Sequence, residues 1–132
     1  MASLIKGIEE GRAVYAYNHV VRLKDNSEAK KYKSYVKRIP IMIKRNGLGP
    51  AIAFIYSKGN VGMGKKDSDN AYKIIYGDIR EFLVKKKLLD PEKELIEKIV
   101  EVDTTEYREL THEILALFTW LRRFVDGMIE GD

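Results

Sequence analysis

Hydrophobic and polar residues follow a helical period along almost the whole chain. The pattern is clearest in the last quarter, where apolar residues recur every three or four positions and form one stripe. The stripe consists of Tyr107, Leu110, Ile114, Leu117, Phe118, Leu121, Val125 and Met128. No segment alternates with a period of two over any length, as a half-buried strand would. The pattern therefore predicts an all-α fold, a compact single domain of five to six helices over residues 1–132.

Capping residues divide this pattern into helices. Asp25-Asn26-Ser27 combines a stop signal with N-cap residues, Asn46-Gly47 is typical of a helix C-terminus, and Pro50 and Pro91 suit a first helical turn. We predict helices over about residues 3–22, 27–46, 49–58, 69–87, 90–99 and 103–128. The first of these has among its apolar positions Ile5, Ile8, Val14, Tyr15 and Val21.

Two glycine-containing stretches connect predicted helices. At the first, we expect a positive φ for Gly47, which costs glycine almost nothing, and insertion of Leu48 into the core between the second and third helices. The second, residues 59–66, carries three glycines before two lysines, as phosphate-binding loops do. It lacks a closing Gly-Lys-Ser/Thr and no strand precedes it, so a mobile surface loop is the better interpretation.

Composition narrows the class of protein. With 132 residues, 45% of them hydrophobic, the chain is long enough for one globular domain with a buried core. No window approaches the roughly 18 apolar residues of a membrane span, and the first residues lack the apolar core of a signal peptide. We therefore expect a soluble cytoplasmic protein without a membrane partner. The absence of Cys and Gln beside many Lys and Glu is typical of thermophiles, although chance in a short chain explains it as well.

Positive charge is concentrated in the first half of the chain. Residues 1–60 carry 12 basic and 4 acidic side chains, whereas residues 61–132 carry 12 and 16. Residues 29–66 contain ten basic side chains and no acid. A merely solvated surface usually mixes both signs, so this segment favours a polyanionic partner, nucleic acid first of all. Acids of the second half that fold over the segment would neutralise it instead.

The second predicted helix carries most of this charge opposite its apolar face. At 100° per residue, that apolar face consists of Ala29, Tyr32, Tyr35, Val36, Ile39, Met42 and Ile43. Four lysines fall within an arc of about 60° on the other side and span roughly 21 Å, although Pro40 is expected to kink the helix near its end. Two arginines of the last helix can also reach solvent. The candidate nucleic-acid contacts are Lys30, Lys33, Lys37, Arg38, Lys44, Arg45, Arg122 and Arg123.

Residues for catalysis or metal binding are scarce. Without Cys the chain has no disulfide, thiol nucleophile or Cys-based zinc site, and His19 and His112 fall on different predicted helices. Glu113 follows His112 directly, so the two side chains diverge by about 100°. An acid–base pair or metal site would have to arise from residues far apart in the sequence. We therefore expect a protein that is not an enzyme and has no catalytic residue, metal or cofactor.

Several tyrosines interleave with the lysines. They are Tyr32, Tyr35, Tyr56, Tyr72 and Tyr76. Such rings can stack on nucleic-acid bases. Because an amphipathic ring also suits the edge of a core, we expect most of them to be core edges.

Two long motifs stand out. The first covers residues 32–54 and contains Asn46-Gly47-Leu48, and the second covers residues 107–124 and contains Trp120-Leu121-Arg122-Arg123. Together they resemble the small subunit of the Cmr complex, the fifth Cmr protein of type III-B CRISPR systems. Both stand in the family's order, and with the helices between them the resemblance covers nearly the whole chain. Pro50 and Val125 are mild departures from the family's pattern.

The resemblance implies a non-catalytic, all-helical subunit of an RNA-guided effector. Copies of such a subunit stack beside the backbone subunits that hold the guide RNA, and the groove between the two filaments receives single-stranded target RNA. Other subunits cleave that RNA. The implied partners are therefore other Cmr subunits, further copies of this chain, guide RNA and target RNA, with the basic residues named above as the RNA-binding candidates.

Two expectations concern assembly. The isolated chain is expected to be largely monomeric, because its surface is highly charged and offers no obvious large apolar patch. Trp120, about 100° from the centre of the last helix's stripe, is the candidate interface residue, and a buried core position is the alternative. A stand-alone helical nucleic-acid-binding module and a small helical enzyme are the alternative functions.

Overall fold

The structure is a computed structural model that describes residues 2–63 and 70–131, with side chains from residue 11 onward. Within these residues there are six α-helices, one short 3-10 helix and no strand, so the predicted all-α fold is confirmed. The elements are α1 (Ala2–Leu23), α2 (Ala29–Asn46), α3 (Leu48–Lys58), the 3-10 helix η1 (Val61–Met63), α4 (Ala71–Lys85), α5 (Leu95–Glu101) and α6 (Thr104–Met128).

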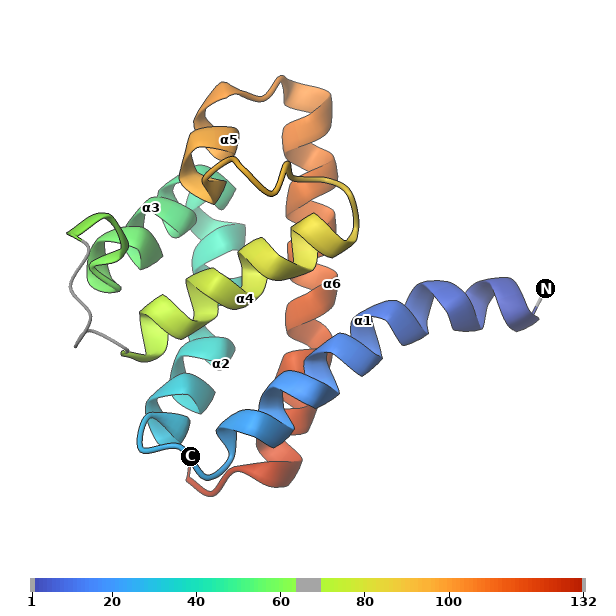
Figure 1. Cartoon of the computed structure of the whole chain (residues 1–132), viewed down its shortest axis with the longest axis vertical. Coiled ribbons are helices and arrows are strands. Elements are labelled where there is room, and N and C mark those ends of the chain that lie inside the picture. Colours follow the sequence, from blue (N-terminus) through green and yellow to red (C-terminus); the bar gives the residue numbers. More distant parts are fainter. Residues whose placement is uncertain (1, 64–69, 132) are drawn as a thin grey trace.

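Two long helices, α2 and α6, run past each other in opposite directions through the centre of the molecule (Figure 1). Helix α4 crosses α2 and packs on it, while α3 and α5 pack together at one end. Helix α1 crosses the lower half of α6, and its first turns extend away from the other helices. This arrangement leaves one side of the α2–α6 pair uncovered by α1 and α4.

The core lies between these helices and is built from the two predicted apolar faces. In α6 the stripe is buried from Leu110 to Val125, and both of its end residues are half-buried. In α2 every residue of the predicted apolar face is buried or half-buried. Tyr32, Phe82 and Phe118 are among the largest fully enclosed side chains, and each such burial contributes roughly 1.5–3 kcal/mol.

The buried side of helix α1 agrees only in part with the predicted apolar positions. Val14 and Val21, predicted on the apolar side, are 53% and 36% exposed, whereas Arg12 and His19 are buried. Arg12 pairs with Glu113 of α6 at 2.9 Å, and His19 contacts acids of α4. Tyr15, also predicted on the apolar side, is buried at 6% exposure. The buried side of α1 therefore combines hydrophobic residues with polar groups whose partners lie on other helices.

Helix boundaries agree with the prediction at the cap of α6 and differ at the starts of α2 and α5. Helix α2 begins at Ala29 with Glu28 as its N-cap, and not within the predicted Asp25-Asn26-Ser27 signal. Asn70 caps α4 and Asp103 caps α6, each through a side-chain oxygen that accepts the backbone N–H three residues on. Helix α5 begins at Leu95 rather than at residues 90–91. In the preceding turn, Arg80 of α4 donates to the carbonyl oxygens of Pro91 and Lys93, and Glu94 is extended.

Gly47 joins α2 to α3 in the predicted conformation. Its φ is 94° and its ψ 162°, a region that essentially only glycine occupies. Its N–H donates to the carbonyl of Ile43 and completes the last turn of α2. Leu48 begins α3 and is fully buried, so both expectations for this turn are confirmed.

Some predicted features lie outside the described residues. These are residues 64–66 of the predicted loop, Asp69 at the predicted start of the fourth helix, and the side chains of Ile5 and Ile8.

Candidate nucleic-acid interface

An open groove between α2 and α6 collects basic side chains that are far apart in the sequence. Its volume is about 430 Å³. Its lining residues are Pro40, Lys44, Leu115, Phe118, Thr119, Arg122, Arg123 and Asp126. Lys44, Arg122 and Arg123 are exposed, and α2 continues through Pro40 as one helix. Three of the predicted candidates thus converge in this α2–α6 groove.

One carboxylate, Asp126, reduces the positive charge of the α2–α6 groove. Its Oδ1 lies 3.0 Å from Nζ of Lys37, and its Oδ2 lies 4.0 Å from Nε of Arg122. The hydrogen bond from Lys37 lowers the pKa of Asp126, so the carboxylate is charged at neutral pH. Exposed pairs of this kind contribute only about 0.2–1 kcal/mol each. The second half of the chain therefore neutralises part of the basic face, as the alternative interpretation of the charge pattern held.

Lys33 does not reach solvent, and the prediction that it does is wrong. The residue is 5% exposed, and its Nζ donates to the carbonyl oxygens of Ile129, at 2.7 Å, and Gly131, at 2.9 Å. The chain beyond α6 folds back over α2 and provides these acceptors. Lys30, near the same end of α2, is exposed as predicted.

Arg38 and Arg45 lie on a different side of α2 from the groove. The guanidinium of Arg38 lies 5.5 Å from the ring centre of Tyr35, and Tyr35 stacks on Tyr72 of α4 with centres 3.8 Å apart. Arg45 is exposed and, seven residues further along α2, lies on the same side as Arg38. The eight candidates therefore occupy separate surfaces instead of one continuous face.

Trp120 is half-buried, which agrees with a partly exposed position and not with the alternative of a buried core residue. Its ring stacks on Phe124 with centres 6.0 Å apart, and Phe124 meets Tyr17 of α1 edge-on at 5.5 Å. Tyr17 is 49% exposed. The three rings form a partly exposed aromatic surface where α1 crosses α6.

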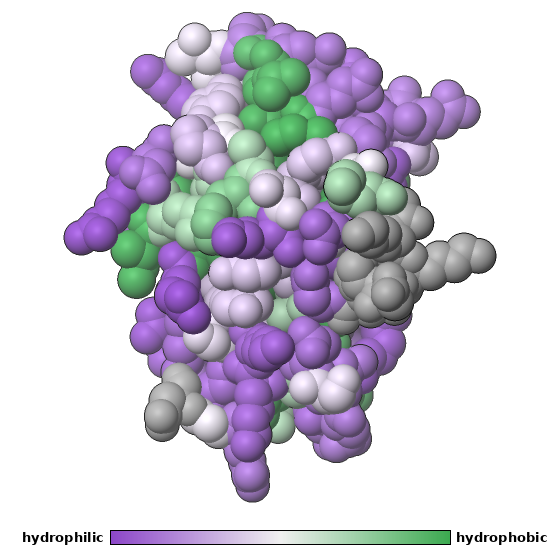
Figure 2. Space-filling view, turned by 90° about the vertical axis from the view of Figure 1, so that its left-hand side faces the viewer, coloured by the Kyte–Doolittle hydropathy of each residue, from purple (hydrophilic) through white to green (hydrophobic). Residues whose placement is uncertain are grey.

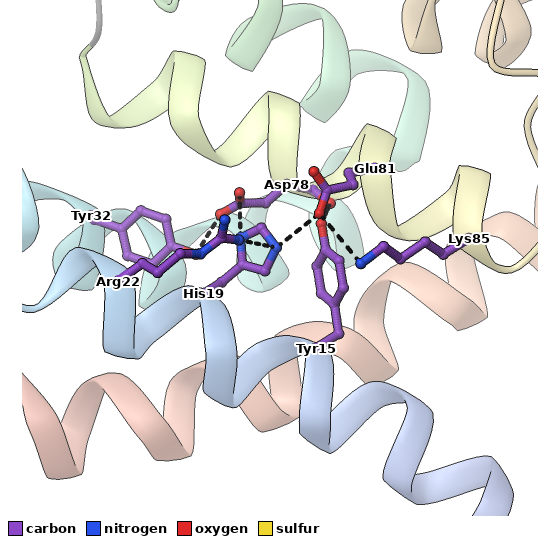
Figure 3. Close-up of polar contacts among 7 residues, drawn as sticks. All are labelled: Tyr15, His19, Arg22, Tyr32, Asp78, Glu81 and Lys85. Carbon is purple, nitrogen blue, oxygen red and sulfur yellow. Dashed lines mark hydrogen bonds and ion pairs between the residues drawn. The ribbon is translucent and has the colours of Figure 1, made fainter.

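A buried polar cluster around His19 ties α1, α2 and α4 together (Figure 3). His19 Nδ1 lies 2.8 Å from Oδ1 of Asp78, and the hydroxyl of Tyr32 donates to Oδ2 of Asp78 at 2.8 Å. The Tyr15 hydroxyl donates to the backbone carbonyl of Asp78 at 2.7 Å. Burial, and then the charge of Asp78, raise the pKa of Tyr32 well above its ordinary value, so its hydroxyl remains a donor. These partners lie 46 to 63 residues apart, which is why the sequence pattern missed them.

The second ring nitrogen of His19 also has protein partners. Its Nε2 lies 3.0 Å from Nη2 of Arg22 and 3.2 Å from Oε1 of Glu81. A neutral ring with its proton on Nδ1 donates to Asp78 and accepts from Arg22 at Nε2. Burial raises the pKa of Glu81, but the interactions with His19, Tyr15 and Lys85 together outweigh it, and the net shift is downward. A general base needs a nitrogen within reach of its substrate, and both nitrogens of His19 are held by the protein.

Features of a metal site or a membrane span are missing from the part of the chain that the structure describes. It contains no group of three or more His, Asp or Glu arranged to hold a metal ion. None of its helices is long and apolar enough to cross a membrane. His112 is exposed on α6, away from the buried cluster of His19.

Comparisons with known proteins agree with the two sequence motifs. The family model described as "CRISPR-associated protein (Cas_Cmr5)" matches residues 8–128. A relative from Thermus thermophilus, named CRISPR system Cmr subunit Cmr5, is 28% identical over 115 residues, which cover 87% of this chain and 90% of the relative. The X-ray crystal structure of a CRISPR-associated Cmr5 family protein, also from Thermus thermophilus, is similar with a TM-score of 0.72 and 25% identity, over 92% of this chain and 97% of that chain.

The fold and the groove define a small all-α protein with basic surfaces on its second and last helices. The chain belongs to the Cmr5 family, the small subunits of type III-B CRISPR systems. The resemblance found in the sequence is therefore confirmed.

Proposed function

We propose that this chain is a non-catalytic small subunit of a type III-B Cmr ribonucleoprotein, and that it helps bind and position single-stranded target RNA along the guide RNA in antiviral defence. The observation that carries the proposal is the α2–α6 groove, in which Lys44, Arg122 and Arg123 converge from two helices beside a single carboxylate. Membership of the Cmr5 family provides the setting.

The groove acts on the RNA backbone in this proposal. Lysine and arginine side chains on a helix surface meet phosphates and carry no sequence information. That suits a complex whose sequence choice comes from base pairing with a guide. Lys30 and Lys37 lie fourteen and seven residues before Lys44, on the same side of α2, and extend the basic path toward the end of α6. Binding is then indifferent to sequence and weakens steeply with salt, because phosphate contacts release counterions.

The partners in this proposal are other Cmr subunits, among them the backbone subunit, and further copies of the chain within the complex. The aromatic surface of Tyr17, Phe124 and Trp120 is the proposed contact with a neighbouring subunit, since aromatic residues are enriched where interfaces bury area. The isolated chain is largely monomeric. It contributes no catalytic group, which agrees with the two engaged nitrogens of His19.

Co-purification tests the proposed function. A tagged chain expressed in its native host is captured, bound proteins are identified by mass spectrometry, and bound RNA is sequenced. We expect other Cmr subunits and guide RNA in the capture. A matched chain with Trp120→Ala and Tyr17→Ala should recover less of both. Capture of RNA without other Cmr subunits would identify a stand-alone nucleic-acid-binding module and refute the proposal.

A further inference from the structure

A second surface, away from the α2–α6 groove, combines aromatic rings with cations. Tyr35 and Tyr72 stack in parallel with ring centres 3.8 Å apart and planes 10° apart, and Phe54 meets Tyr72 edge-on at 5.6 Å. Arg38 lies 5.5 Å from the ring centre of Tyr35, and Lys58 lies 5.7 Å from that of Phe54. The three rings come from α2, α4 and α3, and we call them the aromatic row.

Within residues 29–63, the described stretch that provides Tyr35, Arg38, Phe54 and Lys58, the charged side chains are all of one sign. No residue between 29 and 63, the stretch that forms α2, α3 and η1, is acidic. Glu28 precedes this stretch, and its carboxylate already accepts the backbone N–H of Ala71 at the start of α4. Figure 2 looks at the side of the molecule on which α2 and α3 lie, and hydrophilic residues predominate there, with hydrophobic residues between them. A partner for this surface must therefore be anionic and must offer groups that pack on aromatic rings.

Single-stranded nucleic acid has this chemistry. Proteins that bind it without sequence preference pair a basic surface with aromatic rings on which bases stack. An acidic protein segment would match the charge but has no need of stacked, parallel rings.

We propose that the aromatic row is a base-stacking site for single-stranded RNA, with one base held between the Tyr35 ring and the Arg38 guanidinium. This inference rests on the proposed function, because it takes the same RNA as ligand, but it assigns a second site with a different chemistry. Bases pack against the aromatic row, whereas phosphates meet the cations of the α2–α6 groove.

The geometry of Tyr35 supports this assignment. Tyr72 covers one face of the ring at 3.8 Å, so Arg38 lies over the other face. Arg38 is exposed, and its Nη2 donates to Ser34 Oγ, one turn earlier on the same helix, at 3.1 Å. The guanidinium can therefore move outward and admit a base without opening the core. A planar guanidinium stacks on both bases and aromatic rings, and Tyr72 fixes the Tyr35 ring from behind.

The test compares two ligands that differ only in their bases. The full-length chain is titrated with a fluorescently labelled oligouridine and with an abasic ribose-phosphate oligomer of the same length and charge, at one low salt concentration. Both oligomers carry phosphates that can bind the cations of the α2–α6 groove, but only oligouridine has bases that can stack on the aromatic row. We expect the wild-type chain to bind oligouridine roughly tenfold more tightly, in line with the effect of one stacked base.

Three variants assign the preference to the aromatic row. Tyr35→Ala should abolish the preference for oligouridine, and Tyr35→Phe should keep it, because stacking needs the ring and not the hydroxyl. Arg38→Lys keeps the charge and removes the planar group, so it should reduce the preference while far-UV circular dichroism stays unchanged. A groove variant, Lys44→Glu with Arg123→Glu, should weaken both oligomers by the same factor and leave the preference intact.

The outcomes separate this inference from the proposed function. If the wild-type chain binds both oligomers equally and salt weakens both, the groove contacts stand and the base-stacking site is refuted. The aromatic row would then serve a protein contact. If the preference persists in both Tyr35→Ala and Arg38→Lys, the stacking site lies elsewhere and the assignment is also refuted. If neither oligomer binds and the assembled complex loses no RNA with the groove variant, the proposed function and this inference both fail.

Discussion

Replacement of Gly47 by alanine should destabilise the protein through backbone strain and one displaced contact. At φ 94° and ψ 162°, Gly47 lies where a residue with a Cβ costs about 1–3 kcal/mol. A Cβ there would also lie 3.2 Å from the hydroxyl of Tyr107. That hydroxyl accepts the N–H of Gly49 at 2.7 Å, a hydrogen bond worth about 0.5–1.5 kcal/mol. Together these terms lower the free energy of unfolding by roughly 2–4 kcal/mol.

Thermal and urea denaturation followed by far-UV circular dichroism measure this change. At about 3–4 °C per kcal/mol for a domain of this size, Gly47→Ala should melt roughly 6–15 °C below the wild type. Gly49→Ala is the matched control, because its Cβ would meet the same Tyr107 hydroxyl at 3.4 Å, an ordinary contact, and its φ is not positive. Gly77→Ala, with no atom within 4 Å of the added Cβ and a position inside α4, should raise the stability by up to about 1 kcal/mol. If Gly47→Ala melts no lower than Gly49→Ala, the strain assigned to this turn does not exist.

Three further predictions concern charged side chains. Asp126→Asn removes the carboxylate of the α2–α6 groove, so single-stranded RNA should bind several-fold more tightly at low salt in fluorescence anisotropy titrations. This gain in affinity should vanish at high salt. An unchanged or lower affinity would contradict RNA binding in the groove. Lys33→Met leaves the carbonyls of Ile129 and Gly131 without their donor, so the free energy of unfolding should fall by about 1–3 kcal/mol. The affinity for RNA should stay nearly constant. A loss of affinity equal to that of Lys44→Glu would show that Lys33 contacts RNA. Burial raises the pKa of Glu113, but the hydrogen bond from Arg12 and the nearby positive charges of Arg12 and Lys86 together outweigh it, and the net pKa lies below its ordinary value of 4.5. The Glu113 contribution to stability is therefore complete above about pH 4.5 and is lost as the pH falls through the lower, folded-state pKa; urea denaturation between neutral and acidic pH should show this loss, and Glu113→Gln should make the acid limb shallower.

The parts of the fold that the sequence predicted are those that depend on local spacing. The α6 stripe and the apolar face of α2 follow from one helical period, and the cap at Asp103 follows from residue type and position. Gly47 was predictable because few residues besides glycine accept its conformation. The start of α5 was not, because it depends on Arg80 of α4, which donates to the carbonyl oxygens of Pro91 and Lys93.

The candidate site was predictable in its charge but not in its geometry. Helical spacing placed Lys33 with the exposed lysines, yet carbonyls from the end of the chain accept its hydrogen bonds and offset the cost of burying its ammonium. Asp126 lies 89 positions from Lys37, so no pattern within α2 could reveal that pair. The stacking of Tyr35 on Tyr72 likewise depends on how α4 crosses α2. In each case the missing information was a contact between segments far apart in the sequence. Residue type and helical period do not reveal such contacts.

The most direct measurement of the central claim is target-RNA binding by the assembled Cmr complex that carries Lys44→Glu, Arg122→Glu and Arg123→Glu in this subunit. The control complex carries Lys24→Glu, Lys87→Glu and Arg108→Glu, three exposed cations that do not line the groove, with the same change in charge. We predict that both complexes assemble and that only the groove variant binds target RNA more weakly. Its slope of log affinity against log salt concentration should be smaller by about 2, the value for three lost phosphate contacts with a single strand. A groove variant whose affinity and salt slope equal those of the control would show that the α2–α6 groove does not hold the RNA.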